Sequence, residues 1–193
     1  MSTPLRFPSR IGASAARRLF DGSGLLAVPG SVVVVVSLFY PWLHLTLSAC
    51  VFSLCHTTGS QDFSAIEISG GEVLINLLGG PLTALAPLVT GYLHLLYWCL
   101  GAAGFGLLYA VYRFRWKQKA WWLFSILMSL AQLVIVGGTL YQLYQTFKLQ
   151  DGISITILKL TPGSYTQTGP LLLLIGLAVL SLAALLGLRR NRK

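Results

Sequence analysis

Residues 109–128 read YAVYRFRWKQKAWWLFSILM, and this stretch decides how the chain is organised. One apolar run ends at Tyr112 and another begins at Trp121. Between them stand the basic residues Arg113, Arg115, Lys117 and Lys119. Lys and Arg accumulate in cytoplasmic loops beside membrane spans, and aromatic residues gather at the membrane interfaces. The stretch therefore predicts two membrane-spanning helices joined by a short cytoplasmic hinge.

The same pattern extends to both ends of the chain. Basic clusters stand near each terminus, comprising Arg6, Arg10, Arg17 and Arg18 and then Arg189, Arg190, Arg192 and Lys193. Each apolar region between two clusters is long enough to cross a bilayer and return. Most acidic residues fall on the other side of these crossings: Asp62, Glu67, Glu72 and Asp151. The charges predict a multi-pass protein of the plasma or inner membrane with both termini in the cytoplasm.

The composition of the whole chain agrees with this class. Of its 193 residues, 55% are hydrophobic and only 10% are charged, whereas an ordinary globular domain carries about 25% charged residues. The net charge of +9 is explained by the cytoplasmic clusters and by their attraction to anionic lipid headgroups. We therefore expect the lipid bilayer as a partner, and no nucleic acid.

The expected fold is all-α membrane, a four-helix transmembrane bundle with a small extracytoplasmic antiparallel β-sheet formed by the two outer loops. Within a membrane domain of residues 23–188, the predicted spans cover about 23–42, 82–112, 120–145 and 169–188. The predicted outer loops cover 43–81 and 146–168, and the cytoplasmic parts are an N-terminal arm, 1–22, and a basic tail, 189–193.

The sheet is predicted from alternating apolar and polar residues, which are typical of half-buried strands. In the first outer loop, Leu43, Leu45 and Leu47 alternate with polar residues, and 63–69 is a second strand candidate. In the second outer loop the strand signal is Ile153, Ile155 and Ile157, continuing towards Pro162. Since a lone hairpin is marginal in water, we expect the two loops to share one sheet.

The first outer loop also contains Cys50 and Cys55. In an oxidising compartment these thiols could form a disulfide, and the alternative is that both are unpaired. The residues before Cys50, Leu47-Ser48-Ala49, allow a further interpretation as a lipoprotein processing box. Cys99, inside the second span, is expected to be a small apolar packing residue.

His94 is the ionisable residue within the predicted spans that could carry chemistry, because such residues are often functional. It is a candidate cofactor-binding ligand for a pigment, quinone or haem. The alternative is a neutral His hydrogen-bonded across helices to Gln132. A small pore would require a polar stripe through the bundle, which His94, Gln132 and Thr139 alone do not supply.

Small residues in the second and third spans allow helix backbones to approach closely. The candidates for helix packing are Ala102, Gly106, Gly137 and Gly138. Packing within the bundle is the simpler interpretation, and packing against a partner subunit is the alternative.

The chain contains no nucleophile elbow, P-loop, dinucleotide fingerprint or zinc-ligand pair. Asp and Glu are absent from 81–150. We therefore expect no enzyme activity, no metal and no obligatory cofactor. The leading interpretation is a non-enzymatic membrane protein that acts through protein–protein contacts with a membrane partner or itself. The alternative is a pigment-, quinone- or haem-binding subunit of an electron-transfer complex.

The arrangement of four spans, a longer first outer loop with two cysteines and strand patterns, and a shorter second loop with one strand resembles the claudin-type tetraspan architecture at the level of topology. That resemblance implies a four-helix bundle below an outer sheet, with a role in contacts between proteins. The pattern of Tyr40-Pro41-Trp42 followed by Ser69-Gly70 is also similar to uncharacterised bacterial four-span membrane proteins.

Overall fold

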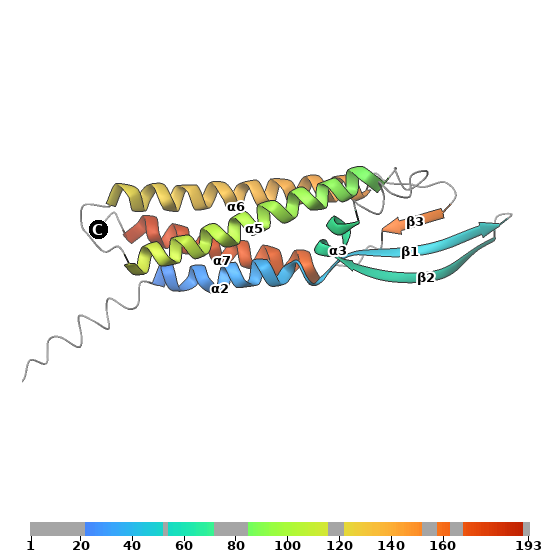
Figure 1. Cartoon of the computed structure of the whole chain (residues 1–193), viewed down its shortest axis with the longest axis horizontal. Helices are drawn as coiled ribbons and strands as arrows, with labels where there is room; N and C mark the ends of the chain where they lie inside the picture. The colour runs from blue at the N-terminus through green and yellow to red at the C-terminus, as the bar shows by residue number, and fades with distance from the viewer. Residues whose placement is uncertain are drawn as a thin grey trace, which may run out of the picture.

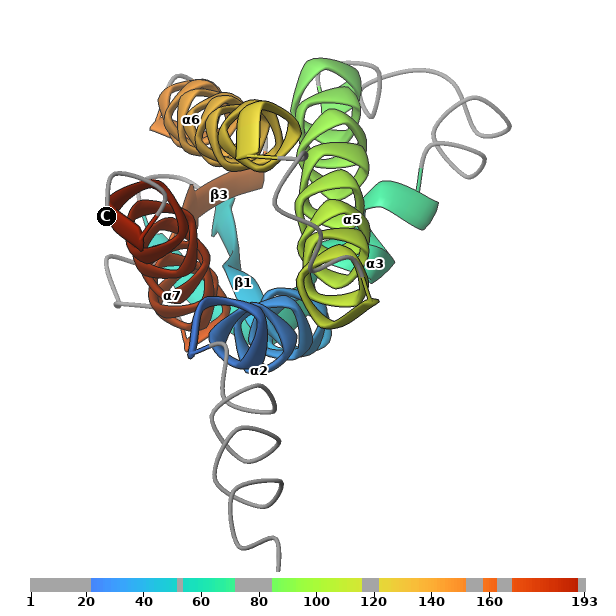
Figure 2. The same ribbon diagram turned by 90° about the vertical axis from the view of Figure 1, so that its left-hand side faces the viewer.

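A bundle of four long helices with a sheet at one end forms the molecule (Figure 1). The computed structural model describes residues 22–51, 54–71, 85–115, 122–151, 158–162 and 168–190. Its long helices are α2 (Gly22–Ser37), α5 (Ala86–Arg115), α6 (Trp122–Asp151) and α7 (Thr168–Arg190). Viewed along the bundle, α2 packs between α5 and α7, which both also contact α6 (Figure 2).

Three of these helices, α5, α6 and α7, are long and apolar enough to cross a membrane. Their presence agrees with the predicted class of multi-pass membrane protein. The helix α6 continues to Asp151, so residues 146–151, predicted to begin the second outer loop, are helical. The helix α5 begins at Ala86, later than predicted, and Pro87 suits the first turn of a helix because its missing N–H is not needed there.

The helix α2 is shorter than the predicted span of 23–42. Its 16 residues rise about 24 Å, which is less than the roughly 30 Å of a hydrocarbon core. After Ser37 the chain makes a turn in which Leu38 N–H donates to Val35 O and Tyr40 N–H donates to Ser37 O, at 3.1 and 3.3 Å. Pro41, the next residue, has no N–H to continue a helix. A strand begins there instead.

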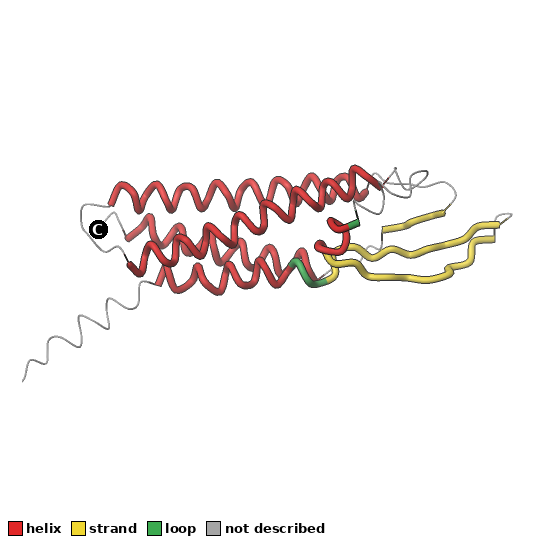
Figure 3. The backbone as a smooth tube through the Cα atoms, viewed as in Figure 1, coloured by secondary structure: helices red, strands yellow, loops and turns green. Residues whose placement is uncertain are grey.

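The sheet has three antiparallel strands, β1 (Pro41–Val51), β2 (Leu54–Ser64) and β3 (Leu158–Pro162), in the order β2-β1-β3. The central strand β1 pairs with both neighbours, so the two segments predicted as outer loops contribute strands to one sheet, as predicted. The β1–β2 hairpin projects beyond the helix ends (Figure 3). The predicted strand residues Ile153, Ile155 and Ile157 lie outside the described residues.

A short helix, α3 (Ala65–Gly70), follows β2 directly. The predicted strand at 63–69 was therefore wrong from residue 65 onward. Ser64 and Glu67 form a capping box, in which the Glu67 carboxylate accepts from Ser64 N–H at 2.7 Å and Glu67 N–H donates to Ser64 Oγ at 3.3 Å. Such reciprocal bonds satisfy the first N–H groups of a helix, and they start α3 here.

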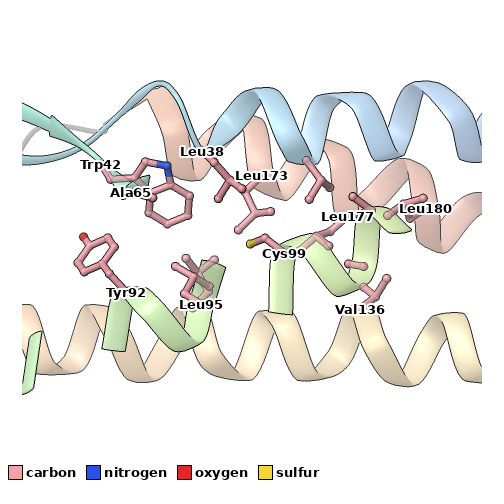
Figure 4. Close-up of a cluster of buried hydrophobic side chains, with 14 of the residues drawn as sticks. Leu38, Trp42, Ala65, Tyr92, Leu95, Cys99, Val136, Leu173, Leu177 and Leu180 are labelled. Atoms are coloured by element: carbon pink, nitrogen blue, oxygen red, sulfur yellow. The ribbon is translucent and has the colours of Figure 1, made fainter. Parts of the chain in front are cut away.

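The helices and the sheet meet at Trp42, which is fully buried. Its Nε1–H donates to Ser37 O at 2.7 Å, and its ring lies edge-on to Tyr92, 6.0 Å away between centroids. Gly169 of α7 leaves room for the Trp42 ring. Further along the bundle, Cys99 points into the apolar core as a free thiol, in agreement with its predicted packing role (Figure 4).

Candidate functional site: the polar face of α6

The buried face of α6 is mostly polar, although the helix as a whole is apolar. Its buried polar side chains are Ser125, Ser129, Gln132, Thr139, Thr146 and Gln150. They follow one another at intervals of three, four or seven residues, which places them on one side of a helix. Val136 and Leu143 fill the two gaps in this stripe and are also buried. These polar residues therefore form a stripe along α6 that Val136 and Leu143 interrupt.

Most hydroxyl groups of the stripe donate hydrogen bonds to backbone carbonyls of α6 itself. Ser129 Oγ donates to Ser125 O at 3.0 Å, Thr139 Oγ1 to Ile135 O at 2.9 Å, and Thr146 Oγ1 to Gln142 O at 2.9 Å. Hydroxyl groups one turn from a carbonyl commonly form such bonds in helices. These side chains can therefore lie inside a membrane bundle without an external partner.

At the end of the bundle away from the sheet, the stripe meets Arg113 of α5. Arg113 is 9% exposed, and its guanidinium group bonds to its own helix and to two neighbouring helices. Nη1 donates to Ser125 Oγ at 2.8 Å, Nε to Tyr109 Oη at 3.3 Å, and Nη2 to Gly187 O at 3.1 Å. Gly187 lies in the last turn of α7, where unpaired carbonyls attract cations. Arg113 thus joins α5, α6 and α7.

At the sheet end, the stripe bonds to the first turns of α5. Tyr92 Oη donates to Gln150 Oε1 at 3.1 Å, and Thr146 Oγ1 donates to Gly91 O at 3.3 Å. Tyr92 is also the ring that contacts Trp42. This end of the stripe is therefore tied to the junction between helices and sheet.

Gln132, between these two ends, is 1% exposed. Within the described residues neither its Nε2 nor its Oε1 has a hydrogen-bond partner. The predicted bond between Gln132 and His94 is not formed, because His94 lies on the exposed side of α5. A cofactor bound through His94 would lie outside the bundle, and that role stays a prediction.

The four small residues predicted for helix packing occupy different surroundings. Ala102 is buried, a side chain at Gly106 would collide with Ser31 and Leu180, and one at Gly138 would collide with the Trp98 ring. A side chain at Gly137 would meet no atom within 4 Å.

The sequence interpretation missed a second pair of small residues, on α2 and α7. A Cβ at Gly176 would lie 2.7 Å from Val34 Cγ2 and 3.1 Å from Gly30 O. Gly30 and Gly176 therefore let the two helices approach closely.

In the sheet, His44 and Asp62 are cross-strand partners, and His44 Nδ1 lies 2.5 Å from Asp62 Oδ1. Among the described residues, no three His, Cys, Asp or Glu side chains are grouped as metal ligands. Polar chemistry in the described part is thus concentrated on α6 and on the sheet.

No protein-family model, curated protein or solved structure matches this chain.

Proposed function

We propose that this chain is a non-enzymatic multi-pass membrane protein that acts through protein–protein contacts, as a scaffold, junction component or accessory subunit of a membrane complex. The observation that carries the proposal is the outer sheet, whose β1–β2 hairpin extends beyond the helices with β2 as its edge strand.

The strand β2 lacks the sequence features that usually protect the edge of a sheet. It has 11 residues, about twice the common strand length. Natural edges are usually protected by Lys, Pro or a short strand, and β2 contains neither Lys nor Pro. Its single acidic residue, Asp62, already contacts His44. Two register shifts interrupt the ladder, one between Pro41 and Leu43 and one between Leu47 and Ser48.

The partner that fits this edge is an extended segment of another membrane protein, added beside β2 as a further strand. Backbone groups on the outer side of β2 would give the affinity, and alternate side chains would give specificity. Within the described residues no strand pairs with that side of β2.

The test uses proline at two neighbouring positions, Ser60→Pro and Gln61→Pro. Successive N–H groups of a strand point to opposite sides, so one proline removes a donor to β1 and the other removes a donor to the partner. We expect one variant to lose the folded hairpin and the other to stay folded but lose its partner. Partners are measured by photocrosslinking from β2 in native membranes, followed by purification in mild detergent. Recovery of the unmodified protein only as a free monomer would contradict the proposal.

We further propose four membrane crossings with both termini in the cytoplasm, as in the claudin-type topology that the sequence resembles. The support is that α2 begins and α7 ends at the end of the bundle where Arg113 lies, away from the sheet. Impermeant thiol reagents should label a cysteine at Ser60 only from outside and a cysteine at Lys117 only from inside. Labelling of position 117 from outside would overturn this topology.

A disulfide between Cys50 and Cys55 is the third part of the proposal. Its support is that the two residues are direct cross-strand partners, and opposite Cα atoms in antiparallel pairs are about 4.5–5.5 Å apart, within disulfide range. Closing so short a loop would stabilise the hairpin by about 2 kcal/mol. Thiol counting by mass spectrometry without reductant should find Cys99 alone reactive after denaturation, and three reactive thiols would exclude the bond.

A further inference from the structure

Gln132 is the buried side chain whose hydrogen-bonding needs the described part of the chain leaves unmet. A primary amide offers two N–H donors and an acceptor oxygen. Burying such a group without partners is strongly unfavourable. A stable bundle therefore needs a small molecule that completes the bonds of this amide.

The helix that faces Gln132, α5, offers few groups that could bond to its side-chain amide. Tyr109 lies beside Ser129, one turn before Gln132, and α5 runs antiparallel to α6, so the part of α5 facing Gln132 is near Gly106. Gly106 has no side chain. The hydroxyl next to it, that of Ser31, donates within its own helix at 2.8 Å.

We propose that Gln132 is the centre of a buried hydration site, in which bound water reaches the middle of the bundle from the end where Arg113 lies. The ligand must both donate and accept hydrogen bonds, because both the nitrogen and the oxygen of the amide are unpaired. Water does both, is neutral like the amide, and is small enough for a packed helix bundle.

A polar array leads from Arg113 towards Gln132. Arg113 bonds to Ser125 and to Tyr109, and Tyr109 Oη lies 3.5 Å from Ser129 Oγ. That last distance is long for two hydroxyl groups, which usually approach to about 2.7–2.8 Å. The weak contact leaves both hydroxyl groups able to bond to a water molecule beside them. Ser129 is one turn from Gln132 on the same face of α6.

On the other side of Gln132 the core is closed by apolar groups. Val136, one turn further along α6, is 5% exposed, and Leu177 of α7 is 2% exposed in the same buried apolar cluster (Figure 4). Leu143 interrupts the stripe again one turn before Thr146. The proposed site is therefore blind-ended, open towards Arg113 and closed towards the sheet.

Cysteine accessibility tests both the hydration and its direction. In the full chain with Cys50→Ser, Cys55→Ser and Cys99→Ala, reconstituted in oriented vesicles, single cysteines replace Ser129 or Gln132. The matched controls are Val134→Cys, on the exposed side of α6, and Leu143→Cys, beyond the apolar closure. The probe is a small charged methanethiosulfonate, which reacts with the thiolate and therefore needs water.

We expect cysteines at 129 and 132 to react at least about tenfold faster than one at 134, because a thiol in lipid stays protonated. The reaction should come only from the Arg113 side, and position 143 should be slow. Equal rates at 132 and 134 would overturn the proposal, and reaction at 132 from the sheet side would refute a blind-ended site.

A second measurement keeps the native glutamine. The side-chain amide signal of Gln132, assigned by its loss in Gln132→Met, should exchange its protons after transfer to D2O. Gln150, which bonds to Tyr92, is the internal reference at the other end of the stripe. Retention of the Gln132 protons over days would mean a dry amide and would overturn the proposal. Neither measurement depends on the partner of the outer sheet, so this inference can fail while the proposed function stands.

Discussion

Replacing Arg113 by lysine should destabilise the bundle strongly although the charge is unchanged. The guanidinium group reaches acceptors on three residues, Ser125, Tyr109 and Gly187, at 2.8–3.3 Å. A lysine ammonium is a single nitrogen and cannot reproduce this planar fork. If lysine keeps one of the three bonds, two are lost, and a hydrogen bond to a charged group contributes about 1.5 kcal/mol or more. The expected loss for Arg113→Lys is therefore about 3 kcal/mol.

The assay is reversible unfolding of the full chain in mixed detergent micelles, followed by tryptophan fluorescence. The matched control is Arg189→Lys, because Arg189 is exposed and exposed substitutions usually change stability by less than about 0.5 kcal/mol. A loss for Arg113→Lys no larger than that of the control would refute the reasoning that Arg113 holds α5, α6 and α7 together.

Three further predictions concern single side chains. Gly138→Ala should lower stability by about 1–3 kcal/mol, because its new methyl group would collide with the Trp98 ring. Gly137→Ala, where the methyl group meets nothing within 4 Å, should be neutral or gain up to about 1 kcal/mol of helix propensity; thermal unfolding compares the two, and equal effects would contradict the packing. Tyr92→Phe should cost about 1 kcal/mol by leaving Gln150 Oε1 without its donor. Its control is Tyr144→Phe on the exposed side of α6, and equal losses would show that the buried bond contributes nothing. Ser64 N–H and Ser64 Oγ both bond the Glu67 carboxylate and hold its pKa below the ordinary value. The contribution of the capping box to α3 is therefore complete above about pH 4.3, the ordinary Glu value, and is lost as the pH falls through the lowered pKa. Carboxyl NMR should give a midpoint below that of a free glutamate, and Ser64→Ala should raise it; an unchanged midpoint would contradict the assigned cause.

The long helices could be predicted because hydropathy and charge decide them locally. The basic residues from Arg115 to the next apolar segment can be recognised without any tertiary information. The same is true of the alternation of Leu43, Leu45 and Leu47 with polar residues. The capping box at Ser64 and Glu67 was also available in the sequence, and it would have predicted α3. An alternation of apolar and polar residues over a few positions fits a strand as well as one turn of an amphipathic helix, and only the cap distinguishes them.

The polar face of α6 was harder to recognise for a physical reason. Ser and Thr are weakly polar, so a helix that contains them scores as apolar, and only their three- and four-residue spacing reveals one face. Which face of α5 points inward is decided by packing. Tyr92, Leu95 and Cys99 are buried at helical spacing, and His94 falls between them on the outside. Which side of a helix such as α5 faces the core cannot be deduced from the sequence when most residues on every side are apolar.

The direct passage from α2 into β1 gives the molecule a mechanical property. Three turn residues, Leu38, Phe39 and Tyr40, separate helix from strand, and Trp42 Nε1 bonds back to the last residue of the helix. The hairpin has 11 residues per strand and extends about 37 Å. It therefore acts as a long lever arm that is connected to α2 by only a short turn. A force applied to its tip by a bound molecule would act on the Trp42 anchor and then on α2 before any linker could stretch.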